Sequence, residues 1–90
     1  MKLLKAIDAK RISEDANIEK YKQEIEKIFT IIKNRAEQGE FDICLSEPIY
    51  INAILKNKRL FEERGYHIDY YNKLIYIKPF LILSWEEATT

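Results

Sequence analysis

The sequence contains few of the residues that mark specialised chemistry or unusual architecture. Its 90 residues include one cysteine, one histidine, two glycines and two prolines. A single cysteine cannot form an internal disulfide, so we expect a reducing compartment. The scarcity of Gly and Pro argues against a linker, and a hydrophobic content of 47% argues against disorder.

Long apolar runs and excess charge of either sign are also missing. No apolar stretch approaches the roughly 20 residues of a membrane helix, and lysines interrupt the apolar residues of the first ten positions, so we expect neither a membrane span nor a signal peptide. Fifteen basic side chains balance 15 acidic ones. This balance argues against binding to nucleic acid or an anionic membrane through bulk charge.

We expect no metal, no cofactor and no catalytic centre. One His and one Cys fall short of the three or four ligands of a zinc site, and no glycine-rich loop is present to hold phosphate. His67, Asp69, Tyr76 and Lys78 fall on one face of a predicted hairpin, where a general base is conceivable. An open sheet face offers no pocket to exclude water and shift a pKa, so we predict that the protein is not an enzyme.

A long helix is predicted over residues 13–38, with Ser13 as its N-cap and Gly39 just after its end. Its apolar residues recur at helical spacing: Ile18, Tyr21, Ile25, Ile28 and Ile32. A helix of this length spans about 37 Å, whereas a compact domain of this size is roughly 30 Å across. Either the helix bends or residues 1–12 fold back as a short helix, or self-association covers the end with Ile18 and Tyr21, which we favour.

The remainder reads as a strand, a helix and a hairpin. Residues 41–45 alternate as a half-buried strand, and a helix opened by Ser46 and Pro48 ends at Gly65. Residues 66–71 and 74–78 form the predicted hairpin, residues 80–85 continue as extended chain, and 86–90 form a tail. We predict one α+β domain over residues 1–90, a two-layer sandwich in the order helix-strand-helix-strand-strand. Both helices would cover one face of a mostly antiparallel sheet of three strands, or alternatively four.

The pattern resembles a group of small tailed-bacteriophage proteins without an assigned function. The matching stretches are Ala36–Gly39, Phe41–Leu45, Glu63–Tyr66 and Leu83–Trp85. The Pro79–Phe80 insertion before the final strand departs from that pattern. The resemblance implies a viral source and a protein that acts in the host cytoplasm or in the virion, and it assigns no site residues.

Apolar surface is the strongest functional signal. A two-layer monomer with its helices on one side cannot bury the apolar residues of the outer sheet face, and such patches mark protein contacts. The predicted protein interface comprises Ile18, Tyr21, Tyr71, Leu74, Tyr76, Phe80, Ile82 and Trp85. We therefore predict a protein-interaction module that forms a homo-oligomer, with a dimer favoured, and that acts as a phage accessory protein on a host protein.

Three alternatives remain open. Lys56, Lys58, Arg59 and Arg64 form the only basic cluster and are candidate contacts of a nucleic-acid-binding regulator, although a solvated helix face explains them as well. The protein could instead be a virion component. A small ligand could also bind between subunits.

Overall fold

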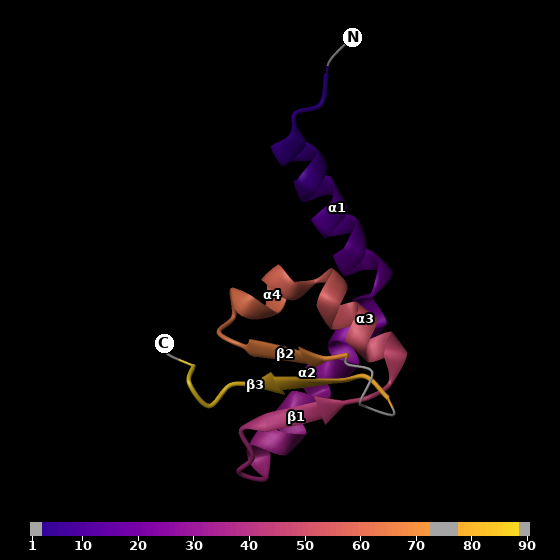
Figure 1. Ribbon diagram of the computed structural model, residues 1–90. Helices are drawn as coiled ribbons and strands as arrows, with labels where there is room; N and C mark the ends of the chain where they lie inside the picture. The colour runs from indigo at the N-terminus through magenta and orange to yellow at the C-terminus, as the bar shows by residue number, and fades with distance from the viewer. Residues whose placement is uncertain (1–2, 73–77, 89–90) are drawn as a thin grey trace.

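The computed structural model describes residues 3–72 and 78–88 of the chain. It confirms an α+β fold in which helices cover one face of an antiparallel sheet (Figure 1). The elements are α1 (Ala6–Lys20), α2 (Lys22–Glu37), β1 (Asp42–Leu45), α3 (Pro48–Lys56), α4 (Lys58–Glu62), β2 (His67–Tyr71) and β3 (Phe80–Ser84). Each of the two predicted helices is thus divided in two.

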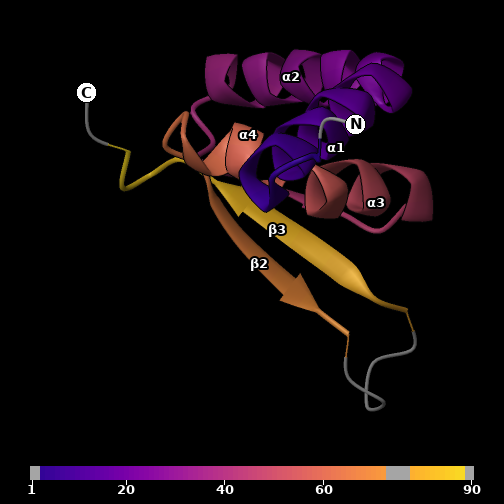
Figure 2. The ribbon, with the colours of Figure 1, turned by 90° about the horizontal axis from the view of Figure 1, so that it is seen from above.

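The sheet has the strand order β1-β3-β2, and both pairings are antiparallel. Leu83 of β3 lies between Ile43 of β1 and Ile68 of β2, and Leu81 lies between Leu45 and Tyr70. Because directly paired residues point to the same face, these six side chains share the face that carries the helices. Figure 2 shows the four helices gathered on one side of β2 and β3.

The hydrophobic core fills the space between this sheet face and the helices. Its buried residues are Ile25, Ile28, Ile32, Ile43, Leu45, Ile51, Ala53, Ile54, Phe61, Leu81 and Leu83. Aromatic rings extend it at one end, where Phe29 stacks on Phe61 at 5.2 Å between ring centroids and Tyr66 meets both rings edge-on. All of α2, α3, α4, β1 and β3 contribute, whereas α1 has no buried residue.

The predicted helix start at Ser13 is wrong. The helix begins at Ala6, after Lys5, and Ser13 lies exposed in its interior. Residues 6–12 contain Ala, Lys, Arg and Ile but no breaker, so nothing in this stretch stops the helix from starting earlier. The joint between α1 and α2 is Tyr21, whose φ of −107° and ψ of 19° depart from helical values. Residues 3–12 therefore extend away from the domain and do not fold back on it (Figure 1).

The second predicted helix begins two residues later than Ser46 and is interrupted once. Glu47 occupies the N-cap position, Pro48 stands at the first helical residue as expected, and Asn57 separates α3 from α4. Gly39 and Gly65 have φ values of +85° and +91°, which confirms both as the helix-ending residues that the sequence predicts.

The predicted hairpin partner of β2 is wrong. The sequence pairs His67 with Lys78 and Asp69 with Tyr76, but in the structure they pair with Ser84 and Ile82 of β3. Tyr70 lies on the helix-facing side as predicted, yet it is 41% exposed at the sheet edge. Most of the predicted strand 74–78 lies outside the described residues, namely Leu74, Ile75, Tyr76 and Ile77.

The overall shape is elongated because of α1. The extents are 54 × 36 × 23 Å and the radius of gyration is 15.1 Å, against about 12 Å for a compact chain of this length. The sequence prediction that the first helix outreaches its domain therefore holds.

Candidate functional site

The outer face of the sheet gathers several of the predicted interface residues. By strand register, this face carries Asp42, Cys44, His67, Asp69, Tyr71, Phe80, Ile82 and Ser84. The Tyr71 and Phe80 rings stack at 4.8 Å between centroids, and both residues and Ile82 are half-buried. Tyr71, Phe80 and Ile82 thus share one face as predicted, while Leu74 and Tyr76 lie outside the described part of the chain.

Trp85 and Tyr21 are not on this face. Trp85 meets Tyr66 edge-on at 6.2 Å between centroids, and its backbone N–H donates to the carbonyl oxygen of Phe41. Alternation along the chain turns residue 85 to the same side as Leu81 and Leu83, so Trp85 packs against the core. Tyr21 is also half-buried against the core. The prediction of these two residues as interface anchors needs correction, because both already have partners within the chain.

Among the described residues, the most exposed aliphatic side chains lie on and just before α1. Leu3 is 82% exposed, Leu4 63%, Ile7 59% and Ile12 58%. Ile18 is 37% exposed near the point where α1 meets the domain. Sequence reasoning that began the helix at Ser13 missed the first four of these residues, although their spacing upstream of Ser13 was available as a signal.

The base of α1 is anchored to the helix layer by Asn57, the one buried polar residue among those described. Its side-chain amide N–H groups donate to the carbonyl oxygen of Ala53 at 2.9 Å and of Asn17 at 3.4 Å. Asn57 therefore marks the break between α3 and α4 and connects that break to α1.

We expect Asn57→Ala to lower the free energy of unfolding by about 1–3 kcal/mol, because a buried donor pair is lost and two carbonyl oxygens lose a partner. Urea denaturation followed by circular dichroism measures the change. Asn52→Ala, at an exposed position of α3, is the matched control and should change stability by less than about 0.5 kcal/mol. Equal effects of the two changes would contradict the anchoring role of Asn57.

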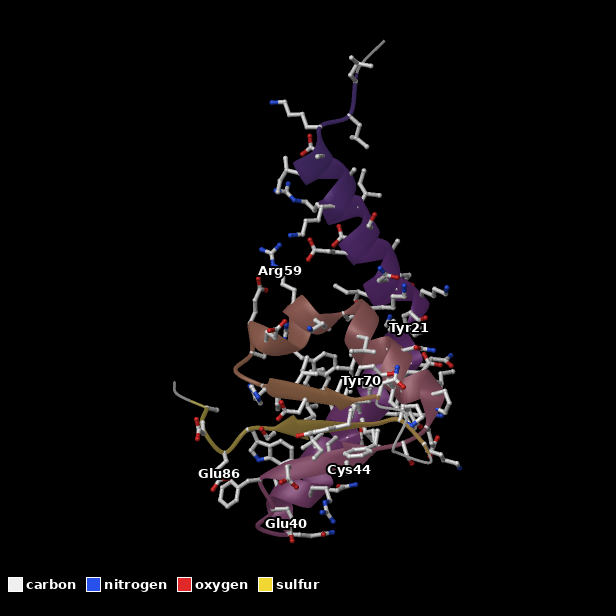
Figure 3. The ribbon with its side chains drawn as sticks, in the orientation of Figure 1. Tyr21, Glu40, Cys44, Arg59, Tyr70 and Glu86 are labelled. Atoms are coloured by element: carbon white, nitrogen blue, oxygen red, sulfur yellow. The ribbon has the colours of Figure 1, made fainter. Side chains whose placement is uncertain are left out.

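Arg59 bridges α4 and α1 at the surface. Its Nε donates to Glu63 Oε1 at 2.6 Å, and its Nη1 lies 3.4 Å from Glu14 Oε1 (Figure 3). The hydrogen bond and charge of Glu63, with a smaller contribution from Glu14, raise the pKa of Arg59 above its ordinary value. Since the guanidinium group is solvent-exposed, these contacts orient the side chain more than they stabilise the fold.

Beside this bridge lies a hollow of about 270 Å³ between α1 and the α3–α4 junction. Arg11, Glu14, Asp15 and Ile18 line it from α1, and residues 56–60 with Glu63 line it from the other side. Its lining combines two apolar side chains, Ile18 and Leu60, with charges of both signs.

The predicted nucleic-acid contacts do not form a free basic surface. Arg59 is paired with two carboxylates, and Arg64 donates from Nη1 to the carbonyl oxygen of Leu60. Lys56 and Lys58 are exposed beside them. The mixed charge of this region reduces its attraction for phosphate.

His67 and Asp69 lie together on the outer sheet face, with His67 Nε2 3.2 Å from Asp69 Oδ1. Both side chains are exposed, at 71% and 46%, so water screens the pair. Across the described ranges, no group of three or more His, Cys, Asp or Glu side chains is placed to hold a metal ion. Cys44 is exposed, away from the core, as predicted.

Comparison with protein-family models, curated proteins and solved structures finds no match. The resemblance to small bacteriophage proteins therefore stays a prediction. None of the helices in the described residues is both long enough and apolar enough to cross a membrane.

Proposed function

We propose that the protein is a non-enzymatic interaction module that self-associates through α1. The observation that carries the proposal is the projection of a 15-residue helix that has no buried residue and bears exposed aliphatic side chains. An isolated helix of this length is marginally stable in water, and helices in proteins gain most of their stability from packing. A contact that covers α1 supplies that packing.

A second copy of the chain is the proposed occupant. Domains of about this size bury a smaller fraction of their surface than larger domains do, and they commonly gain stability by oligomerisation. The exposed residues Ile7 and Ile18, three helical turns apart, lie on one side of α1, so two such helices can cover each other.

The outer face of the sheet supports self-association less strongly than α1 does. Its Tyr71 and Phe80 rings are half-buried and stacked on each other, so the apolar area that this face offers is smaller than the sequence suggests. Action on a host protein as a bacteriophage accessory factor is supported by the sequence resemblance alone. The mixed charges around Arg59 do not favour nucleic acid as the partner.

Light scattering after size-exclusion chromatography tests self-association. We expect the mass of the full chain to approach that of a dimer between tens and hundreds of micromolar. Ile7→Glu should return the protein to a monomer with unchanged thermal stability of the domain, because Ile7 contributes nothing to the core. Ile49→Glu, which changes an exposed aliphatic residue of α3, is the matched control and should leave the dimer intact. A monomer throughout this concentration range would refute the proposal.

A further inference from the structure

The apolar stripe that packs α2 onto the core continues without a break in spacing onto α1. In α2 it consists of Ile25, Ile28 and Ile32, which are buried. Upstream, the same alternating steps of three and four residues give Leu4, Ile7, Arg11, Glu14, Ile18 and Tyr21. This is a heptad pattern in which two positions are charged and the others are apolar.

Helical hydrogen bonding continues across the joint at Tyr21, although the backbone angles of Tyr21 depart from helical values. The N–H of Ile25 still donates to the carbonyl oxygen of Tyr21 at 2.8 Å, so helical hydrogen bonding passes through the joint. Asn17 and Glu14 both contact the α3–α4 region, through Asn57 and Arg59. Glu14 and Ile18 therefore lie on the side of α1 that faces the α3–α4 junction, and α1 continues beyond α4 (Figure 1).

We propose, as a development of the function proposed above, that α1 pairs with α1 of a second copy in antiparallel orientation. In an antiparallel coiled-coil pair, each a position of the heptad faces a d position of the other helix. Centring the pair between residues 12 and 13 places Ile7 against Ile18 of the second copy. The same register places Arg11 against Glu14, and the two-fold axis repeats every contact.

Charge complementarity selects the antiparallel orientation. A parallel pair would set Arg11 against Arg11 and Glu14 against Glu14, with like charges facing each other at the centre of the seam. The antiparallel pair converts both positions into Arg–Glu contacts between copies. Polar residues at core positions of short coiled coils commonly fix orientation and register, and these two fill that role here.

In the proposed dimer, a side chain of the second copy enters the hollow beside α1. The hollow is lined by Ile18 and Glu14 on one side and by Leu60 and Arg59 on the other. In the proposed register the first turn of the second copy, which carries Ile7, arrives at the level of Ile18. The aliphatic side chain of Ile7 would there cover Ile18 and Leu60.

Charge reversal tests the central contacts. Arg11→Glu or Glu14→Arg alone should weaken the dimer at least about tenfold, because each change places like charges opposite each other twice. A mixture of the two variants should regain a dimer of near wild-type affinity, since both central contacts become Glu–Arg again. Glu19→Arg on α1 makes the same charge change off the stripe. It should leave the dimer unchanged, and a loss that equals the loss in Glu14→Arg would overturn the proposal.

Cysteine cross-linking tests the orientation. Ile7→Cys and Ile18→Cys are made separately in a Cys44→Ser background, because Cys44 is exposed. In the antiparallel register two copies of residue 7 lie about 16 Å apart along the axis, beyond the roughly 7 Å that a disulfide spans between Cα atoms. We expect a disulfide-linked dimer from the mixture and little from either variant alone.

Linkage of each variant with itself would indicate a parallel pair and overturn the inference while leaving self-association intact. A wild-type dimer without any linkage would overturn it as well, whereas a wild-type monomer would refute the proposed function itself.

Discussion

Phe61→Ala should lower the free energy of unfolding by about 3–5 kcal/mol, which is the usual cost of removing a buried phenylalanine ring. Phe61 is fully buried, stacks on Phe29 and meets Tyr66 at 6.2 Å between ring centroids. It is also the buried residue through which the short helix α4 joins the core. A domain of this size has little stability in reserve, so we expect a large unfolded fraction at 37 °C.

Thermal and urea denaturation measure this change, and Phe41→Ala is the matched control. Phe41 is 55% exposed at the start of β1, so the same substitution should cost about 1 kcal/mol or less. Similar losses for the two variants would contradict the central place of Phe61.

The second large effect is expected at the centre of the sheet. Leu83→Ala should lower the free energy of unfolding by about 2–5 kcal/mol, since Leu83 is fully buried between Ile43 and Ile68 on the helix-facing side. Ile82→Ala, one residue earlier on the outer face, should cost less than half as much because Ile82 is only half-buried.

The two variants are denatured at low micromolar protein concentration, so that the free energy of unfolding reports on the monomer without a contribution from dimerisation. A larger loss at Ile82 than at Leu83 would mean that the sheet faces are assigned the wrong way round. Repeating the Ile82→Ala measurement at high protein concentration also shows whether the outer face is covered in a dimer.

The fold class could be predicted because local patterns agree with the tertiary structure. The helical spacing from Ile25 to Ile32 becomes the core face of α2, and the two glycines end helices through positive φ angles. Apolar and polar residues alternate over Phe41–Leu45 because one face of β1 packs on the core and the other is solvated. In each case the local sequence pattern is compatible with a single secondary structure.

The strand pairing could not be predicted in this way because two segments competed to pair with residues 67–71. Both 74–78 and 80–84 have suitable strand patterns, and the shorter loop favoured the first, although loop-closure cost rises only slowly with length. In the structure the more apolar segment, Phe80–Leu83, is the central strand, where β1 and β2 pair with its two edges and the helices bury Leu81 and Leu83 on one face.

The interface residues were predicted in part for the same reason. Tyr71, Phe80 and Ile82 share a face because strand alternation places them there. Trp85 was misplaced because its contact with Tyr66 joins residues far apart in sequence. Ile7 is absent from the predicted interface because the predicted N-cap at Ser13 places it outside the long helix, whereas the structure places it in the first turn of α1.

The strand order β1-β3-β2 also has a consequence for how the chain acquires its fold during synthesis. The two edge strands are made first, and in the described sheet they do not pair with each other. Each must wait for Phe80–Ser84 before its backbone finds a strand partner, so the nascent chain holds helices α2 to α4 without a sheet beneath them. A stop codon before residue 80 would therefore remove both strand pairings of the described sheet, and the aliphatic faces of those helices would become a target for chaperones.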